Sequence, residues 1–480
     1  MTPNSVIYAA FLLGTAILHS LLPARARTVF LLAASYGFYL LCTPKALPLL
    51  LAATAWNYLL ARGMAARPGR RKLLLVTGLV LDLGVLFLFK YLNFSISLVD
   101  LLLKRDPGKG LSLLQPAGVS FYTFTVCGYL MDVYRGDREA EKDPVRFGLF
   151  TAFFPAILSG PIERSGHLLP QLALQRRAGL EDWQAGSLRF LIGLCKKMVL
   201  ADRLAILVNA AYRVYDQCTG AQLLAAALAY SLQIYCDFSA YTDMAIGSAR
   251  LFGITLTENF DAPYLSRSIK EFWRRWHISL SAWFRDYLYF PLGGSRRGSW
   301  RTRLNLLIVF TLSGLWHGAA LTFVVWGLLN GLYQVIGELC APARRQVHRA
   351  LHLHEDSLPL RVVQPVIVFL LSTAAWVFFR AESLSQALEI LRRIFTLTGG
   401  LVLPDLVALG LGRAWLLTVG VGVVLLFVFD LTDRHRSLCS RLCDTVAARY
   451  AVCLALLVSA LVFGAYGAGY DAQEFVYFRF

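Results

Sequence analysis

The sequence predicts an all-α protein that crosses a membrane many times, and three observations lead to this fold class. Of the 480 residues, 57% are hydrophobic and only 16% are charged, whereas soluble domains carry roughly 25% charged residues. The apolar residues gather in segments that approach the roughly 20 residues of one helical crossing. The basic residues stand mostly in short loops between these segments, as they do in multi-pass membrane proteins.

The apolar segments follow one another along the whole chain. They cover residues 6–22, 28–42, 46–61, 73–89, 118–133, 147–161, 190–210, 221–249, 304–338, 361–379, 414–430 and 450–467. The first has no Lys or Arg before it and is followed at once by Arg27 and a second apolar run, which favours a retained helix over a cleaved signal peptide. We expect about 11 to 13 transmembrane helices, with interfacial and re-entrant helices, in one integral membrane domain over residues 1–480.

The segment 304–338 is too long for a single crossing and contains Gly314, Gly318 and Gly327. We expect two helices that meet near His317 and Gly318. An ionisable side chain at the end of a strongly apolar run is costly in a membrane and is usually functional. Burial disfavours a charged imidazole, so an embedded His317 would be neutral and able to accept a proton. A structural histidine satisfied by hydrogen bonds is the alternative.

Three basic loops, residues 62–72, 270–303 and 344–349, predict the orientation, because cytoplasmic loops are rich in Lys and Arg. Five apolar segments separate the first two loops. Since this number is odd, one of the five must be re-entrant or interfacial. Membrane anchoring thus accounts for the formal charge of +17, and no soluble basic module predicts nucleic-acid binding.

Residues 271–294 are dense in aromatic and basic side chains and too polar to span a membrane. In a helical projection the apolar face carries Trp273, Trp276, Leu280, Trp283, Phe284 and Tyr287. Another face carries Lys270, Arg274, Ser281 and Arg285. The pattern predicts an amphipathic helix at the membrane interface. His277 falls between the two faces. Its role there is either to contact a ligand or to be a plain interfacial histidine.

Five arginines of this region suit phosphate groups, because guanidinium forks match phosphate oxygens. They are Arg274, Arg275, Arg285, Arg296 and Arg297. Anchoring to anionic lipids is the alternative role.

Other polar residues are less suited to catalysis. Asp237 and Asp243 are six residues apart and therefore about 120° out of phase on a helix, which argues against a paired-carboxylate site. We expect both carboxylates to make polar contacts within the helix bundle. One such contact would be with a histidine, whose ring it would orient. His348, His352 and His354 lie in a basic stretch without a clustered Cys or a suitable carboxylate geometry, so no metal site is expected.

Several motifs occur in a fixed order along the chain. The longest is composed of Asn259–Tyr264, Phe272–Ser281, Trp283–Tyr289 and Pro291–Gly294. Supporting motifs are Phe154–Pro155, Gly160–Ile162, Leu169–Leu172, Asp237–Ser239, Leu315–Gly318, Trp376–Ala381 and Phe475–Phe480. Together these residues resemble the membrane-bound O-acyltransferase family, in particular its alginate O-acetyltransferase branch, with the teichoic acid D-alanyl transfer protein as a relative. Residues 259–294 form the motif segment, which is expected at the interface.

The resemblance implies that His317 corresponds to the family's catalytic histidine and His277 to its second functional histidine. His317 would act as general base, by direct transfer or through an acyl-histidine, and His277 would orient the donor or stabilise charge on the thioester oxygen. The implied donor is acetyl-CoA, a substrate rather than a tightly bound cofactor. Its expected binding residues are Arg274, Arg275, Arg285, Trp276 and Trp316.

The resemblance also implies a bacterial inner-membrane protein. Its acetyl groups would reach hydroxyls of an exported polysaccharide such as alginate through a periplasmic partner acetyltransferase that is SGNH-hydrolase-like. The alternatives are D-alanyl transfer to an envelope polymer and a non-catalytic export subunit that tolerates loss of both histidines. A transporter, suggested by Asp82, Lys90, Asp132 and Asp237, would instead predict repeated interrupted half-helices.

Overall fold

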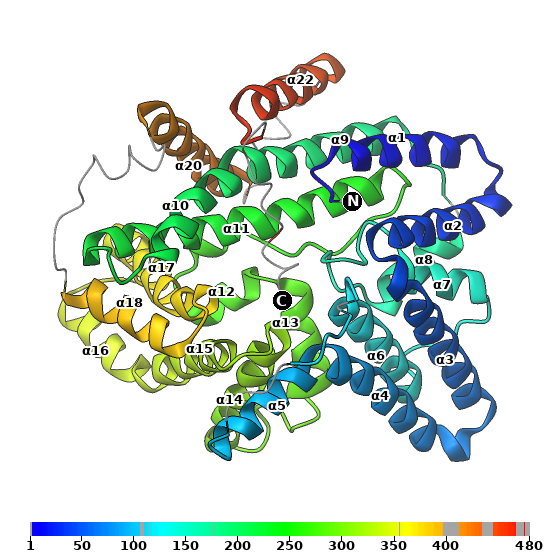
Figure 1. Ribbon diagram of the computed structural model, residues 1–480, viewed down its shortest axis with the longest axis horizontal. Coiled ribbons are helices and arrows are strands. Elements are labelled where there is room, and N and C mark those ends of the chain that lie inside the picture. Colours follow the sequence, from blue (N-terminus) through cyan, green and yellow to red (C-terminus); the bar gives the residue numbers. More distant parts are fainter. Residues whose placement is uncertain are drawn as a thin grey trace. The chain divides into compact units, whose positions relative to one another are not determined.

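The computed structural model describes residues 2–105, 110–114, 116–174, 176–354, 356–396, 412–433, 445–466 and Phe475. Within these ranges every regular element is helical, which confirms the predicted all-α class (Figure 1). Of the C-terminal motif 475–480, all residues after Phe475 lie outside the described ranges. The chain forms two compact units, unit 1 (Met1–Gly193 and Tyr241–Glu258) and unit 2 (Leu194–Ala240 and Asn259–Phe480). One integral domain over residues 1–480 stays a prediction.

Unit 1 is built from the first nine helices. They are α1 (Val6–Leu21), α2 (Ala24–Cys42), α3 (Leu47–Ala66), α4 (Arg71–Leu86), α5 (Leu92–Leu102), α6 (Val119–Arg135), α7 (Pro144–Ala152), α8 (Ser165–Leu174) and α9 (Leu180–Cys195). Short turns η1 (Pro44–Ala46), η2 (Pro68–Arg70) and η3 (Phe87–Tyr91) join some of them. The long helix α11 (Gly220–Arg250) contributes its C-terminal part to unit 1 and its N-terminal part to unit 2.

Unit 2 holds the remaining helices. They are η4 (Lys196–Ala201), α10 (Asp202–Arg213), η5 (Pro263–Leu265), α12 (Ile269–Arg275), α13 (Ile278–Phe284), η6 (Arg285–Tyr289), α14 (Ser299–His317), α15 (Leu321–Leu339), α16 (Ala341–Ala350), α17 (Leu358–Arg380), α18 (Leu384–Thr396), α20 (Arg413–Asp433) and α22 (Val446–Phe463). The π-helical turns η4 and η6 each continue directly from or into an α-helix without a loop.

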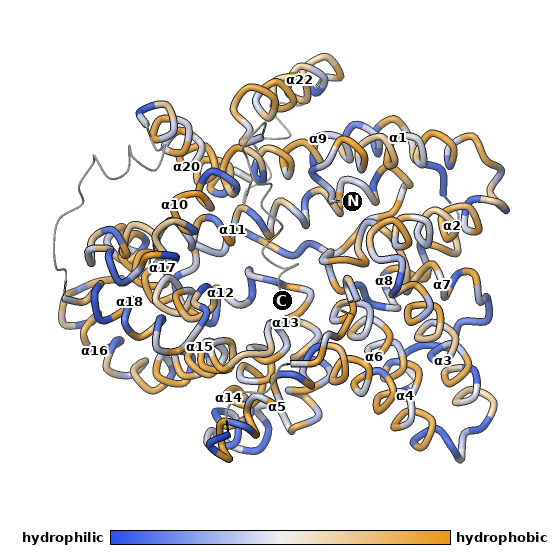
Figure 2. Tube along the Cα trace, viewed as in Figure 1, coloured by the Kyte–Doolittle hydropathy of each residue, from blue (hydrophilic) through white to orange (hydrophobic). Residues whose placement is uncertain are grey.

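Five described helical segments are long and apolar enough to cross a membrane, namely Pro68–Leu102, Gly220–Arg250, Leu358–Arg380, Arg413–Thr432 and Val446–Phe463. A sixth is counted when α15 and α16, which meet at a bend of 51°, are taken as one broken span. This number is smaller than the predicted 11 to 13, because predicted segments such as those of α1, α6 and α7 form helices shorter than 18 residues. In Figure 2, α20 and α22 are coloured as hydrophobic along most of their length, and most of their residues are not buried in the protein. Such outward-facing apolar surface suits lipid.

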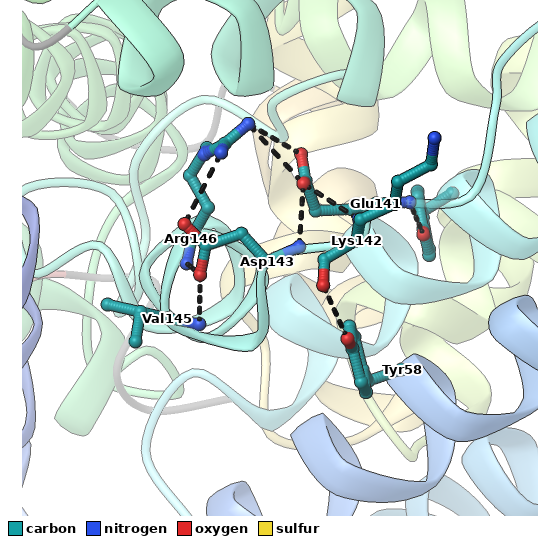
Figure 3. A network of polar contacts seen from close by, with 7 residues as sticks. Tyr58, Glu141, Lys142, Asp143, Val145 and Arg146 are labelled. Carbon is teal, nitrogen blue, oxygen red and sulfur yellow. Dashed lines mark hydrogen bonds and ion pairs between the residues drawn. The ribbon is translucent and has the colours of Figure 1, made fainter.

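Helix α7 lies in one of the five predicted segments between the first two basic loops. Its nine residues are about 13.5 Å long, and a bilayer core is about 30 Å thick. This helix is therefore too short to span the membrane. Figure 3 shows how α7 begins: the Asp143 carboxylate accepts hydrogen bonds from the backbone N–H groups of Val145 and Arg146. The Arg146 guanidinium pairs with both Asp143 and Glu141.

The charged groups that suggested a transporter have local partners in the protein. Asp82 is 2% exposed. Its carboxylate accepts hydrogen bonds of 2.9 Å from both Trp56 Nε1 and Asn57 Nδ2. Lys90 Nζ donates to Ser120 Oγ at 3.2 Å. These contacts satisfy buried polar groups within unit 1, which is a structural role.

Candidate active site

The predicted helix junction at His317 is present. Helix α14 ends at His317, and α15 begins four residues later. The two helices lie side by side (Figure 1), and Gly314 and Gly327 face each other where they cross. A Cβ atom on either glycine would collide with backbone atoms of the other helix, so only small residues permit this approach. His317, which is 2% exposed, is thereby fixed at the end of a rigid helix pair.

His277 lies in a sharp break between α12 and α13 and not within one amphipathic helix. Its backbone is left-handed, with φ of 45°, a conformation that costs an ordinary residue about 1–2 kcal/mol. An antiparallel backbone contact with residues 259–261 compensates: Ile278 N donates to Asn259 O, and Asp261 N donates to Arg275 O, each at 3.0 Å. The prediction of one uninterrupted amphipathic helix in residues 271–294 was therefore wrong.

The aromatic face predicted for this segment exists, but it is buried in unit 2. Trp276 and His277 are both 0% exposed, and Trp273, Leu280, Trp283, Phe284 and Tyr287 are also buried. His277, which the sequence placed between two faces of the segment, is enclosed for the same reason. The break between α12 and α13 turns the aromatic face inward, where it packs against helices that are distant in the sequence.

The two histidines are neighbours in unit 2. Their ring centroids are 6.0 Å apart, and the ring planes are inclined by 56°. Trp316 lies beside both, 5.0 Å from the His317 ring and 6.0 Å from the His277 ring. Residues 40 positions apart in the sequence thus form one cluster, in which one imidazole comes from the helix break and the other from the end of α14.

An aromatic enclosure surrounds His317. The Trp326 ring of α15 meets it edge-on at 5.1 Å, and the Phe379 ring of α17 lies at 5.5 Å. Trp376 stacks on Trp326 at 5.4 Å and extends the enclosure to Trp276 at 5.0 Å. Because aromatic walls exclude water, polar interactions formed inside are stronger than in bulk solvent.

Asn259 holds the His277 side chain from the N-terminal end of the motif segment. Asn259 Oδ1 lies 3.2 Å from His277 Nδ1 and accepts hydrogen bonds from Ser279 N and Ser279 Oγ at 3.1 and 2.9 Å. The Phe238 ring packs against the other side of the imidazole at 4.7 Å. Burial lowers the pKa of His277 to about 3, so the ring is neutral at physiological pH.

The predicted polar contacts of Asp237 and Asp243 are present. Asp237 Oδ1 pairs with Lys197 Nζ at 2.7 Å, and the same ammonium pairs with Asp202 Oδ1 at 2.9 Å. Asp243 in unit 1 pairs with Arg189 Nε at 2.7 Å. Asp237 therefore belongs to a buried ion triad, and its neighbour Phe238 packs against His277.

The predicted donor-binding residues fall into two groups. Trp276 and Trp316 lie in the cluster around the histidines. The three arginines lie toward the surface of the segment: Arg274 is exposed, Arg275 pairs with Glu271 at 2.7 Å, and Arg285 pairs with its neighbour Asp286 at 2.8 Å. Two of the three guanidinium groups are thus already engaged by carboxylates.

Sequence reasoning did not single out Asn259, Phe238, Trp326 and Phe379 as site residues. Asn259, Phe238 and Phe379 stand inside motifs, and an Asn at the start of a long motif is a signal that a polar group is needed there. Trp326 had no such signal, because one Trp in an apolar helix is indistinguishable from a core residue until its neighbours are known.

Comparison with known proteins identifies the family of the chain. Residues 141–372, which include both histidines, match the membrane-bound O-acyltransferase family. The chain is 38% identical over 421 residues to a probable alginate O-acetylase of Pseudomonas putida, covering 86% of this chain and 84% of the relative. It is 34% identical over 399 residues to the peptidoglycan O-acetyltransferase of Helicobacter pylori, covering 77% and 74%.

A more distant similarity extends over part of the chain. A teichoic acid D-alanyltransferase of Bacillus subtilis is 30% identical over 232 residues, covering 46% of this chain and 58% of the relative. These relatives share the transfer of an acyl group in their names. The chain therefore belongs to the membrane-bound O-acyltransferase family and is a multi-pass membrane enzyme that transfers acyl groups to oxygen.

Proposed function

We propose that the enzyme transfers acetyl groups from cytoplasmic acetyl-CoA to hydroxyls of an exported cell-envelope polysaccharide. The observation that carries the proposal is the pair of buried histidine rings, 6.0 Å apart, inside an aromatic enclosure at a helix junction. Relatives named for O-acetylation of alginate and of peptidoglycan support the acetyl group and the polymer class.

In the proposed reaction, His317 is the general base. It takes the proton of the acceptor hydroxyl while the hydroxyl oxygen forms a bond to the acetyl carbon. The carbon–sulfur bond of the thioester then breaks, and the thiolate takes the proton back from the imidazolium. The balance is one acetyl ester and one free thiol, with both histidines returned to their neutral state. A neutral, buried base suits this role because it starts unprotonated near pH 7.

The donor would present its phosphates to the basic surface of the motif segment. Arg274 is the best placed of the three predicted arginines, because it is exposed, while Arg275 and Arg285 are paired with Glu271 and Asp286. Arg274→Ala should raise KM for acetyl-CoA about tenfold, since a charge-assisted hydrogen bond to phosphate is worth about 1.5–3 kcal/mol. Acetylpantetheine, which lacks those phosphates, should show the same KM with both proteins.

The proposed destination of the acetyl group lies outside the cytoplasm. In a bacterial inner membrane, the acetyl group would pass to a periplasmic SGNH-hydrolase-like acetyltransferase and then to the polymer. Deleting the gene should remove acetyl esters from one exported glycan, identified by ester analysis of purified polymers. Loss of D-alanyl esters instead would favour the teichoic-acid type of transfer, for which the Bacillus subtilis relative is the supporting observation.

The central test is radiolabelled acetyl transfer from acetyl-CoA in proteoliposomes. His317→Ala should abolish transfer above background at matched protein level. His348→Ala, on the basic helix α16, is the matched control and should retain wild-type rates. Undiminished transfer by the His317 variant would refute the catalytic role. No transfer by the wild-type protein, together with normal polymer acetylation in cells whose protein lacks both histidines, would favour a non-catalytic export subunit.

A further inference from the structure

The carboxamide of Asn259 has a single orientation that its contacts decide. Asn259 is fully buried, and its Oδ1 position faces Ser279 N at 3.1 Å. A backbone N–H can only donate a hydrogen bond, so the atom opposite it must be the amide oxygen and not the amide nitrogen. The Ser279 hydroxyl at 2.9 Å donates to the same oxygen.

This orientation fixes the proton on His277. An amide oxygen is only an acceptor, so the His277 Nδ1 atom that lies 3.2 Å from it must carry a hydrogen. A neutral imidazole has one N–H, and the fully buried His277 ring is neutral. The lone pair of the ring is therefore on Nε2.

We propose that Asn259 is a positioning residue that holds His277 in the Nδ1–H tautomer, so that Nε2 accepts a hydrogen bond from a substrate N–H or O–H. The inference rests on the proposed function and refines it. A neutral ring with its lone pair on Nε2 has no hydrogen to offer to a thioester oxyanion. Of the two roles expected for His277, orienting a substrate is thereby favoured over stabilising negative charge.

The distance between the histidines lets neighbouring atoms of one substrate contact both rings. Their ring centroids are 6.0 Å apart, which puts the nearest ring atoms close to van der Waals contact at roughly 3.5–4.0 Å. His317 and His277 then act on neighbouring substrate atoms.

The backbone around His277 stays in place when only the Asn259 side chain changes. The hydrogen bonds from Ile278 N to Asn259 O and from Asp261 N to Arg275 O involve main-chain atoms alone. Asn259→Asp also preserves every acceptor contact of Oδ1, because a carboxylate has the same shape and accepts from the same donors. Asn259→Leu removes the acceptor at nearly constant volume.

The direct test is nitrogen NMR of the full chain, labelled with ¹⁵N-histidine, in lipid nanodiscs. The His277 signal is assigned by its loss in His277→Gln. We expect a protonated Nδ1 and an unprotonated Nε2 in the wild type and in Ser279→Ala, which keeps both the acceptor and the imidazole. Asn259→Leu should give a mixture of tautomers. A protonated Nε2 in the wild type would overturn the inference.

The kinetic test uses the pH dependence of kcat/KM. A carboxylate beside Nδ1–H stabilises the imidazolium and raises the pKa of His277 by about 1–3 units. Since a protonated Nε2 no longer accepts a hydrogen bond, Asn259→Asp should lose activity on acidification at a pH about 1–3 units above that of the wild type. Ser279→Ala should keep the wild-type acid limb.

The two proposals fail in different ways. If His317→Ala abolishes transfer but Asn259→Asp keeps the wild-type acid limb, the proposed function holds and the inference about Asn259 is refuted. If His317→Ala remains active while the NMR signals show the Nδ1–H tautomer, the role of Asn259 in setting the tautomer holds and the proposed base is refuted.

Discussion

The buried triad of Lys197, Asp202 and Asp237 gives the sharpest stability prediction. All three residues are at most 2% exposed, and the Lys197 ammonium lies 2.9 and 2.7 Å from the two carboxylates. The cation also lies 4.3 Å from the centroid of the Phe475 ring. Two carboxylates share one ammonium, so the three positions are not equivalent. Removing the cation should be far more damaging than removing one carboxylate charge.

The magnitudes follow from that imbalance. Each ion pair has about 6 kcal/mol of Coulomb attraction at an effective dielectric constant of about 20, most of which offsets desolvation. Lys197→Met leaves two buried carboxylates without their cation and should cost about 3–5 kcal/mol. Asp202→Asn leaves Lys197 and Asp237 as a one-to-one pair and should cost about 1 kcal/mol or less.

The assay is the thermal midpoint of purified protein in one detergent. With about 2–4 °C per kcal/mol, Lys197→Met should unfold about 6–20 °C below the wild type, and Asp202→Asn within about 4 °C of it. The matched control is Lys196→Met, which removes the same charge from the preceding, partly exposed residue. Its thermal midpoint should stay close to that of the wild type. Equal losses for Lys197→Met and Asp202→Asn would refute the charge-imbalance argument.

Three further predictions concern helix packing, pH and the enclosure. Gly327→Ala should lower the thermal midpoint and the transfer rate, because its Cβ would collide with Phe310 O, whereas Gly337→Ala on the same helix meets nothing within 4 Å and should be neutral or stabilising. Because the pKa of His277 is lowered to about 3, the unfolded chain binds a proton that the folded chain does not between about pH 6.5 and 3. Stability should fall by up to about 1.4 kcal/mol per pH unit in that range, and a His277→Gln variant should show a shallower loss between pH 6.5 and 5. Trp326→Leu should reduce kcat, since it opens the wall beside His317, and an unchanged kcat would argue against the enclosure.

The sequence by itself determined the elements whose signals are local. The apolar composition and segment pattern predicted the all-α class, and the glycines near His317 predicted the break between α14 and α15. The helical projection of residues 270–287 correctly separated the buried aromatic residues from exposed residues such as Lys270 and Arg274. Such features depend on composition and on spacing within a few residues, which a sequence displays directly.

Only the tertiary structure decided what the aromatic face touches and how the histidines are held. The break at His277 depends on backbone pairing with residues 259–261, and the acceptor for its Nδ1 is 18 residues away. Trp326 and Phe379 reach His317 from two other helices, and Asp237 contacts a lysine 40 residues earlier. These contacts join segments that are distant in the chain, so neither helical periodicity nor hydropathy encodes them. Their energy comes from packing and hydrogen bonds that exist only once the helices have assembled.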